Sequence, residues 1–568
     1  MKKIIPILIA VVLIVIIGAG TVAGMLYEKY SYSKERADLT SYFQVQGEEK
    51  AIILQDEMIA EKAIMKNGRC YLDMDTVTTY FNEIFYVDLS EQILLYTTAT
   101  EVIRTDFGSS IMRVNGAETD LGYEIVYSEN DVIYIALDYV KLYTNLSYEI
   151  FDQHMQIYNT WGSRTLATLK KDTAIRERGG VKSAILKDLV KGEQVEILEK
   201  MENWSKVKSQ DSFIGYVENK MLMNETQVEE TPVTDYQAPE YTTNQLDGKV
   251  SLGWHSIGGV GGNDTLDSMV AGTIGMNVIA PTWFSLSDNE GNFESFGTVS
   301  YVDRAHNKGL EVWGVLDDFN YNNVHDAGID VYAVLSSTAK RTRLVEGITE
   351  VAVSLGLDGI NLDFERVTAE CGEHYVQFIR ELSVQCRENG LTFSIDSYVP
   401  FNFNSYLRRD IQGQVADYVI IMGYDEHWHG SGDPGSVASI DYVSNGIDKT
   451  LEQVPKEKVV NGLPFYSIVW KTVGADVTDV YLTLNNTKNY LDTLAKQGIN
   501  GEWDEETQQM YYEWKSGGAT YQLWAETEES LAVKINVMKA KDIAGVAVWR
   551  LGYGTKDIWQ MISAYVNA

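Results

Sequence analysis

The sequence predicts a multidomain chain whose C-terminal part, residues 248–568, is a (β/α)8 or TIM barrel with an α+β insertion. First, eight apolar, strand-like runs alternate with helical stretches from Val250 onward, as crossover units require. Second, 568 residues are too many for one ordinary core. Third, the N-terminal half contains short strand patterns broken by turn signals. These patterns predict a small α+β stalk-like domain and a small all-β barrel.

The chain begins with a candidate membrane segment at residues 1–27. Lys2 and Lys3 precede an uncharged apolar stretch, residues 4–27, that is long enough to cross a hydrocarbon core. We expect an uncleaved single-pass anchor at the cell membrane with the C-terminal bulk outside the cytoplasm, because the apolar run continues to Leu26. The alternative is a cleaved signal peptide and a secreted protein.

Residues 40–160 contain an internal echo. The two segments are "YLDMDTVTTYFN" at 71–82 and "YIALDYVKLYTN" at 134–145, and five positions agree. Turn signals separate short apolar segments, which predicts small α+β units. The echo resembles the stalk-like repeats named after the N-terminal domain of copper amine oxidases. It shows no copper ligands, so we expect a spacer.

Residues 163–222 show short alternating strands broken by turn residues, which predicts a small β-barrel. The order Lys191-Gly192-Glu193, Trp204 and Gly215-Tyr216-Val217 resembles the bacterial Src-homology-3-like (SH3-like) domain. That resemblance leaves two roles open, contact with the cell wall or simple spacing. Residues 223–247, rich in Thr, Glu and Pro, are expected to be a linker.

Charge and cysteine content exclude several classes of protein. The formal net charge of -34 disfavours a nucleic-acid binder, which needs clustered Lys and Arg. Cys70, Cys371 and Cys386 share no metal-ligand spacing, so neither a disulfide framework nor a zinc site is indicated. His427 and His429 lack a matching ligand pair, and we expect no metal there.

The barrel strands are expected in eight runs, and the long interval 471–540 before the last run predicts the α+β insertion. A helix between the third and fourth strands should end at Gly356. The runs are "VSLGWHSI", "MNVIAPTWFSL", "LEVWGVLDDF", "LDGINLDFE", "LTFSIDSYV", "DYVIIMGYD", "VVNGLPFYSI" and "GVAVWRLGYG".

The fourth run carries three polar residues at every second position. Asn361, Asp363 and Glu365 share one face of a strand, and Ile360, Leu362 and Phe364 share the other. In a barrel the polar face turns to the axis, where unpaired charge is expensive. An edge strand in water is the alternative, but flanking helical segments argue against it. We expect the two carboxyls roughly 7 Å apart, with Asp363 raising the proton affinity of Glu365 for general acid catalysis.

"LDGINLDFE" is similar to the signature of glycoside hydrolase family 18, the chitinase-like barrels. "MGYD", "GLPFY" and "VWRLG" follow in the expected order, so the resemblance covers about residues 250–565. It implies that Glu365 protonates the glycosidic oxygen and later acts as base. It also implies that Asp363 and Tyr424 hold the substrate's own 2-acetamido group, which serves as nucleophile through an oxazolinium intermediate with retention of configuration.

The same resemblance implies a substrate-binding set. Trp549 would form the apolar floor under the sugar, with a core tryptophan as the alternative. Asp425 would hydrogen-bond the sugar, and Trp254 and Tyr466 would line the groove or only pack. Asn361 belongs to this set as the uncharged neighbour of Asp363. Chitinases commonly carry Asp there, so the pH behaviour should differ from theirs.

The sequence thus predicts a glycoside hydrolase that cleaves β-linked N-acetylglucosamine-containing polysaccharide, with peptidoglycan ahead of chitin. The overall pattern looks closer to the bacterial cell-wall and spore-germination branch than to secreted chitin degraders. The alternative is a non-catalytic, lectin-like wall scaffold, although inactive members typically lose the acid that Glu365 provides. The expected partners are the acetamido glycan, the cell wall through the SH3-like domain, and the membrane. No cofactor or metal is implied.

Overall fold

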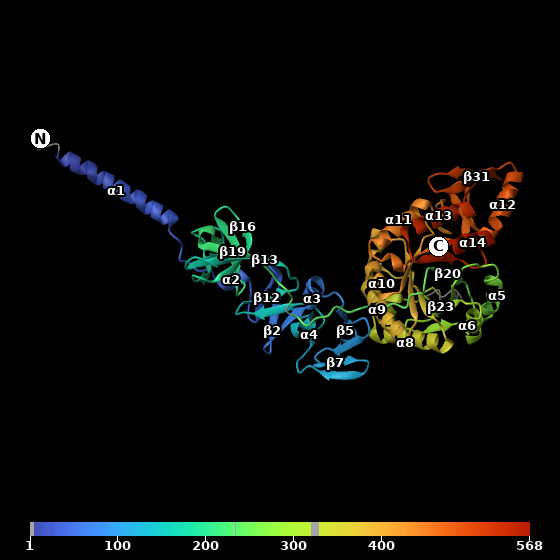
Figure 1. Ribbon diagram of the computed structural model, residues 1–568, viewed down its shortest axis with the longest axis horizontal. Coiled ribbons are helices and arrows are strands. Elements are labelled where there is room, and N and C mark those ends of the chain that lie inside the picture. The colour runs from blue at the N-terminus through green and yellow to red at the C-terminus, as the bar shows by residue number, and fades with distance from the viewer. Residues whose placement is uncertain (1–4, 233, 320–328) are drawn as a thin grey trace. The chain divides into compact units, whose positions relative to one another are not determined.

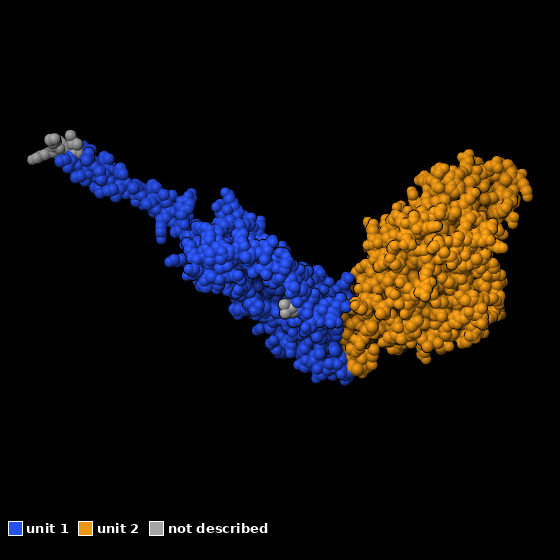
Figure 2. Space-filling view, in the orientation of Figure 1, with its two compact units in different colours: residues 1–85, 105–112, 118–238 blue, residues 86–104, 113–117, 239–568 orange. Residues whose placement is uncertain are grey.

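The computed structural model describes residues 5–232, 234–319 and 329–568. Lys2 and Lys3 of the predicted anchor and residue 233 of the predicted linker lie outside the described residues. The chain forms two compact units, coloured separately in Figure 2. One unit comprises residues 1–85, 105–112 and 118–238, and the other comprises residues 86–104, 113–117 and 239–568.

The apolar N-terminal segment is a single helix, α1 (Ile5–Tyr30). None of its residues is buried. At 1.5 Å per residue it is roughly 39 Å long, which exceeds the hydrocarbon thickness of a bilayer. By length and composition the helix fits either a membrane anchor or a signal sequence.

The internal echo folds as two strand–helix units. The first is β3 (Arg69–Asp73) with α3 (Met74–Tyr80), and the second is β10 (Val132–Ala136) with α4 (Leu137–Leu142). The two strands pair antiparallel with Leu72 opposite Ile135, the positions that the echo also aligns. The repeat is therefore related by a local two-fold axis between the strands.

These units belong to a seven-stranded mixed sheet in the order β11-β12-β1-β2-β3-β10-β9. A short helix, α2 (Leu39–Phe43), precedes it. The remaining strands are β1 (Glu49–Leu54), β2 (Glu57–Lys66), β9 (Val126–Glu129), β11 (Ser147–Ile150) and β12 (His154–Tyr158). Between the echo units a five-stranded sheet is formed by β4 (Tyr86–Asp88), β5 (Ile93–Thr97), β6 (Val102–Asp106), β7 (Ile111–Val114) and β8 (Ala117–Asp120).

The hairpin of β4 and β5 is grouped with the barrel, although the predicted domain at 40–160 includes it. On the barrel, Arg341 forms a buried ion pair with Glu381 at 3.2 Å and donates to the Tyr86 hydroxyl at 3.1 Å. The Thr338 backbone amide donates to Asp88 Oδ2 at 2.7 Å. These contacts join residues about 250 positions apart, which explains why the predicted boundary misses them.

The second small domain is a seven-stranded antiparallel sheet in the order β15-β14-β18-β17-β16-β13-β19, and its sequence matches the bacterial SH3 domain, which confirms the expected SH3-like fold class. The last strand, β19, pairs antiparallel with the first, β13, from Leu222 opposite Leu169 to Glu229 opposite Ser163. The predicted linker at 223–247 therefore begins inside a strand. The strands are β13 (Ser163–Leu169), β14 (Thr173–Arg176), β15 (Ile185–Leu189), β16 (Gln194–Lys200), β17 (Trp204–Ser209), β18 (Ile214–Glu218) and β19 (Leu222–Glu229).

Eight parallel strands close into the predicted barrel (Figure 1). The first strand pairs with both the second and the last, so no edge is left open. A short strand, β22 (Phe293–Ser295), pairs antiparallel with the end of β21. The barrel strands are β20 (Val250–His255), β21 (Val278–Leu286), β23 (Glu311–Asp317), β24 (Gly359–Asp363), β25 (Thr392–Tyr398), β26 (Tyr418–Met422), β27 (Val459–Pro464) and β33 (Gly545–Trp549).

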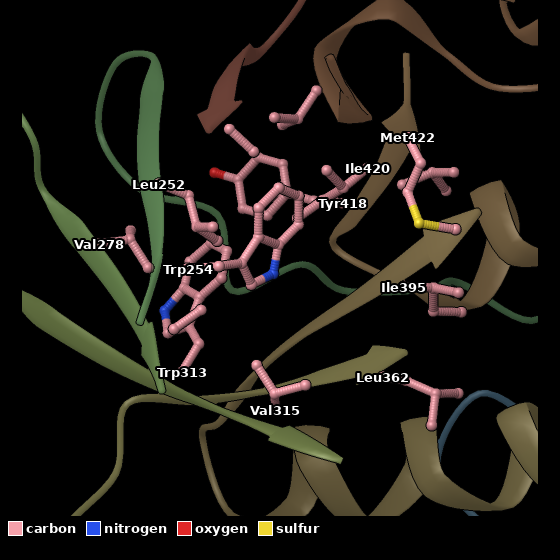
Figure 3. Close-up of a cluster of buried hydrophobic side chains, with 14 of the residues drawn as sticks. Leu252, Trp254, Val278, Trp313, Val315, Leu362, Ile395, Tyr418, Ile420 and Met422 are labelled. Atoms are coloured by element: carbon pink, nitrogen blue, oxygen red, sulfur yellow. The ribbon is translucent and has the colours of Figure 1, made fainter. Parts of the chain in front are cut away.

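Helices surround the strands, and their apolar faces complete one continuous core. Figure 3 shows part of this core, where Leu252, Val315 and Ile420 come from three different strands. The predicted helix end at Gly356 is present, with the glycine in the left-handed region at φ 74°. The helices are α5 (Leu266–Met269), α6 (Val299–His306), α7 (Val331–Leu335), α8 (Thr338–Leu355), α9 (Gly372–Glu388), α10 (Arg409–Val415), α11 (Ile440–Leu451), α13 (Glu528–Lys541) and α14 (Lys556–Val566).

The insertion precedes α13 and is shorter than predicted. It spans residues 466–525, whereas the sequence predicted 471–540, because α13 packs beside α11 and α14 as one of the barrel's own helices. A fully buried pair, Glu526 with Lys534, marks the junction. The inserted elements are β28 (Tyr466–Val473), β29 (Asp476–Thr483), α12 (Leu484–Lys496), β30 (Glu502–Asp504), β31 (Gln509–Ser516) and β32 (Ala519–Ala525).

Candidate active site

A cavity of about 390 Å³ opens at the carboxyl ends of the barrel strands. Seven of the eight predicted site residues line it: Trp254, Asp363, Glu365, Tyr424, Asp425, Tyr466 and Trp549. The remaining wall residues, which sequence reasoning did not single out, are Ser256, Asp396, Tyr398, Met422, Tyr442, Tyr481, Arg550 and Tyr553. The cavity is therefore built from carboxyl groups and aromatic rings, as suits a sugar with polar edges and an apolar face.

The alternation of β24 divides its side chains between the cavity and the helical layer. Asp363 and Glu365 reach the cavity, and Ile360 and Leu362 are fully buried. Phe364 stacks on Phe378 of α9, with ring centroids 5.4 Å apart. The apolar face of this run thus packs under a helix, and the polar face points to the barrel axis.

Asn361 was predicted to belong to the substrate-binding set, but it is not among the residues that line the cavity. The residue is fully buried. Its Oδ1 accepts a hydrogen bond from Trp254 Nε1 at 2.9 Å, and its Nδ2 donates to Ser394 Oγ at 3.0 Å and to Asp396 Oδ1 at 2.9 Å. Asn361 is the innermost of the three alternating residues and lies below the cavity. Its amide instead holds Trp254 and Asp396, which do line the cavity.

Asp363 presents an unsatisfied acceptor. Its Oδ1 is buried and has no hydrogen-bond partner among the described residues. Burial raises the pKa of Asp363 well above its usual range, and the charges of Glu365 and Asp396 raise it further. An orphaned buried oxygen is costly, which suggests that a ligand supplies the missing donor.

Glu365 is poised as an acid near neutral pH. Burial raises the pKa of Glu365 to about 7, whereas a hydrogen bond from the Tyr398 hydroxyl to Oε2, at 2.5 Å, lowers it. The predicted direction agrees with the structure, but the cause differs. Burial is the main cause of the raised pKa of Glu365. Among the neighbouring carboxylates, Asp318 and Asp425 raise this pKa most, rather than Asp363.

Asp318, just after β23, fixes the backbone of the acid. Its two carboxylate oxygens accept the amides of Glu365, at 3.1 Å, and Arg366, at 2.8 Å. The side chain is fully buried, and burial raises the pKa of Asp318 to about 6. The carboxyl-terminal position in "LEVWGVLDDF" is a signal that could have marked this residue, because barrel sites gather at strand ends.

Asp396 on β25 was also missed. The register pairs Asn361 with Ser394, so Asp396 lies beside Asp363 on the next strand. Burial raises the pKa of Asp396 well above its usual range, although hydrogen bonds from Asn361 and Trp254 lower it. "LTFSIDSYV" has the same two-residue polar period as β24, and that period could have revealed both Asp396 and Tyr398.

Tyrosines partner the remaining carboxyl. Tyr466 donates its hydroxyl to Asp425 Oδ1. Tyr424 is buried against the cavity, and burial together with the nearby charge of Asp396 raises its pKa, so its hydroxyl stays a neutral donor. Tyr481, from the insertion, packs edge-on against Tyr466 with centroids 5.2 Å apart. The insertion thus contributes directly to the cavity wall.

Two tryptophans form the apolar side of the cavity. Trp254 and Trp549 meet edge to face, with ring centroids 6.1 Å apart. Trp254 is 2% exposed and also donates to Asn361, so it both lines the cavity and packs the barrel. Trp549 is partly exposed at the end of β33.

The arrangement suits proton transfer and charge stabilisation. A carboxyl with a pKa of about 7 can deliver a proton at neutral pH, and neighbouring carboxyls can stabilise a positive intermediate. Within residues 5–232, 234–319 and 329–568 there is no cluster of three or more His, Cys, Asp or Glu groups that could hold a metal ion.

Comparison with known proteins identifies two modules. Residues 284–554 match the family described as glycosyl hydrolases family 18, and residues 171–223 match the bacterial SH3 domain. These matches confirm the resemblances drawn from "LDGINLDFE" and from the Lys191–Glu193 region. The chain is therefore similar to glycoside hydrolases over its barrel.

Individual relatives are distant. An uncharacterized glycosylase, YvbX, of Bacillus subtilis is 26% identical over 312 residues, covering 50% of this chain and 84% of the relative. The cortical fragment-lytic enzyme of Bacillus anthracis is 25% identical over 240 residues, covering 40% of this chain and 54% of the relative. The crystal structure of a chitinase from Chromobacterium violaceum superposes with a TM-score of 0.49 at 21% identity, covering 56% of this chain and 99% of that one.

Proposed function

We propose that this chain cleaves β-linked N-acetylglucosamine-containing glycan by substrate assistance, because residues 284–554 match the family described as glycosyl hydrolases family 18. The proposed reaction retains configuration and passes through an oxazolinium intermediate. Glu365 acts as acid and base, and Asp363 and Tyr424 hold the 2-acetamido group of the sugar.

One observation carries this proposal, the orphaned Oδ1 of Asp363 beside Glu365. An acetamido N–H is a neutral donor that would satisfy this oxygen without adding charge to the cavity. Binding that N–H also turns the acetamido carbonyl toward the anomeric carbon. The position of the free acceptor therefore supports a nucleophile that comes from the substrate.

The proposed chemistry balances without a cofactor. Glu365 gives its proton to the glycosidic oxygen as the bond to the anomeric carbon breaks, and the acetamido oxygen forms a new bond to that carbon. Asp363 stabilises the positive oxazolinium ring. Water then attacks the anomeric carbon and gives a proton to Glu365. The bond between the acetamido oxygen and the anomeric carbon breaks in the same step. Two displacements leave the original configuration.

The remaining cavity residues are proposed to bind the sugar. Trp549 forms the floor against the C–H face of the pyranose, with Trp254 beside it. Asp425, held by Tyr466, accepts hydrogen bonds from sugar hydroxyls. Tyr424 donates its hydroxyl to the acetamido oxygen.

The N-terminal modules favour a wall substrate. We propose that α1 anchors the chain in the cell membrane with the barrel outside the cytoplasm, and that the SH3-like domain contacts the wall. The α+β region around residues 40–160 is proposed to be a spacer. The similarity to a cortical fragment-lytic enzyme supports peptidoglycan ahead of chitin.

Substrate assistance is tested with paired oligosaccharides that carry or lack the acetamido group at the cleaved sugar. The proposal predicts reducing-end release only from the acetylated member, and nuclear magnetic resonance should show a β-configured product first. Equal cleavage of the deacetylated member, or an α-configured first product, would contradict the mechanism. Binding of every acetamido glycan without release would instead favour the lectin-like alternative.

A further inference from the structure

Arg550 is the one cation among the described residues that line the cavity. The other charged side chains there are Asp363, Glu365, Asp396 and Asp425. The whole chain carries a formal charge of -34, so a positive side chain in this acidic cavity contrasts with the charge of the chain as a whole. Its position raises the question of what its guanidinium pairs with.

Within the protein, Arg550 has a neutral partner. Its Nη2 donates to the Tyr553 hydroxyl at 2.7 Å, and the guanidinium carbon lies 4.6 Å from the centre of the Tyr553 ring. No carboxylate oxygen of the described residues lies within 4.0 Å of it. A guanidinium has five N–H donors in a planar fork, so most of the fork remains available to a ligand.

Three of the four acids that line the cavity accept hydrogen bonds from neutral donors. Tyr398 donates to Glu365, Asn361 donates to Asp396, and Tyr466 donates to Asp425. Neutral donors thus hold these carboxyls in place without Arg550. Arg550 is therefore not required to neutralise any one of them through a direct ion pair.

Substrate binding changes the surroundings of this cation. A glycan that fills the cavity removes water from the guanidinium, and a buried guanidinium without an ionic partner is unfavourable. A neutral chitin-type strand offers hydroxyls and amides only. A strand that carries a carboxylate offers a planar, two-oxygen acceptor that matches the fork.

We propose that Arg550 binds a carboxylate of the substrate and thereby selects anionic acetamido glycan over neutral glycan. This inference rests on the proposed glycosidase function and narrows its substrate to peptidoglycan-type strands. Arg550 directly follows Trp549, the proposed floor of the cleavage point, so the carboxylate belongs to a sugar at or next to that point.

Two parts of peptidoglycan could supply this carboxylate. One is the lactyl ether of a muramic sugar, which ends in a free carboxylate when no peptide is attached. The other is the stem peptide. It is joined to the lactyl carboxyl by an amide bond, which removes that carboxylate, and it carries carboxylates of its own. Both present the same chemistry to the guanidinium, and peptide-free and peptide-bearing strands separate them.

The test measures kcat/KM of the full chain on four substrates. These are a neutral N-acetylglucosamine oligomer, peptide-free wall strands, the same strands with their carboxylates converted to methyl amides, and peptide-bearing strands. We expect wild type to prefer a carboxylate-bearing strand over the neutral and methyl-amide substrates by about tenfold or more. Arg550→Gln should reduce this ratio at least several-fold, and Arg550→Lys should restore part of it.

Lys488→Gln is a matched control, because it removes one positive charge from α12 outside the cavity. It should leave the ratio unchanged. In wild type, equal kcat/KM for the methyl-amide strands and for both kinds of carboxylate-bearing strand would overturn the inference while the glycosidase function stands. The same ratio in Arg550→Gln as in wild type would also overturn it.

Binding separates this inference from the proposed function. Calorimetry on Glu365→Gln and on the Glu365→Gln/Arg550→Gln double variant measures the same preference without turnover. If wild type cleaves no acetamido glycan, the proposed function fails, and the calorimetric ratio still decides the role of Arg550. Tighter binding of free strands that depends on Arg550 supports it, and equal binding refutes it.

Discussion

Tyr398→Phe tests how the acid is tuned. The Tyr398 hydroxyl donates to Glu365 Oε2 at 2.5 Å. This bond stabilises the ionised carboxylate and so opposes burial, which raises the pKa of Glu365 to about 7. Burial, followed by the charge of Glu365, also raises the pKa of Tyr398, so the phenol remains a donor. Removing the hydroxyl leaves burial unopposed, and the pKa of Glu365 should rise.

The size of the rise follows from the bond. A hydrogen bond to a charged group contributes about 1.5–3 kcal/mol, and each pKa unit corresponds to 1.36 kcal/mol, which gives about one to two units. Tyr398 is 38% exposed, so water replaces part of the lost bond. We therefore expect a rise of about one unit.

The assay is the pH profile of kcat/KM, which reports the free enzyme. A general acid must be protonated, so a higher pKa moves the alkaline limb to higher pH in Tyr398→Phe. Tyr442→Phe is the matched control, because Tyr442 lines the cavity and no hydrogen bond joins it to Glu365 in the described part of the chain. An unchanged limb, or one displaced to lower pH, would refute the assignment of this limb to Glu365.

Three further variants test the surrounding residues. Asn361→Asp replaces the donor 2.9 Å from Asp396 by a second acceptor, and should destabilise the fold by about 2–4 kcal/mol at neutral pH. Because folding would raise the pKa of this new carboxyl, the loss should grow as pH rises above the unfolded value, and pH-independent melting would contradict this. Lys534→Met leaves the fully buried Glu526 without its ionic partner, with the neutral donors Gln509 and Ser530, and should cost about 3–5 kcal/mol in denaturant unfolding. Adding Glu526→Leu should recover most of that loss, and no recovery would argue against the ion pair as its cause. Asp318→Asn removes one of the two acceptors that hold the backbone of the acid, and should lower kcat about 10- to 100-fold with little change in KM. A change in KM alone would assign Asp318 to substrate binding instead.

The barrel could be predicted because local patterns determine its strands. Each of the eight apolar runs contains one barrel strand, and α8 ends where the sequence places Gly356. The alternation in "LDGINLDFE" also predicted which side chains face the axis. Both signals depend on neighbouring residues only, so one sequence suffices to read them.

The rest depends on contacts between distant residues. The polar period of "LTFSIDSYV" could have marked Asp396 as facing the axis. Its place beside Asp363 depends on the register of β25 with β24, which the sequence alone does not give. Asn361 has the same alternation as its neighbours, yet its depth in the barrel removes it from the cavity. The hairpin at Tyr86 packs on Arg341 across 255 positions, so local composition alone assigns it to residues 40–160.

Glu365→Gln tests the central claim most directly. The substitution keeps the shape of the side chain and removes its proton, so reducing-end release from N-acetylated wall glycan should fall by about 10²- to 10⁴-fold. Binding of the same glycan, measured by calorimetry, should persist. Turnover close to wild type in Glu365→Gln would contradict the claim that this carboxyl is the acid.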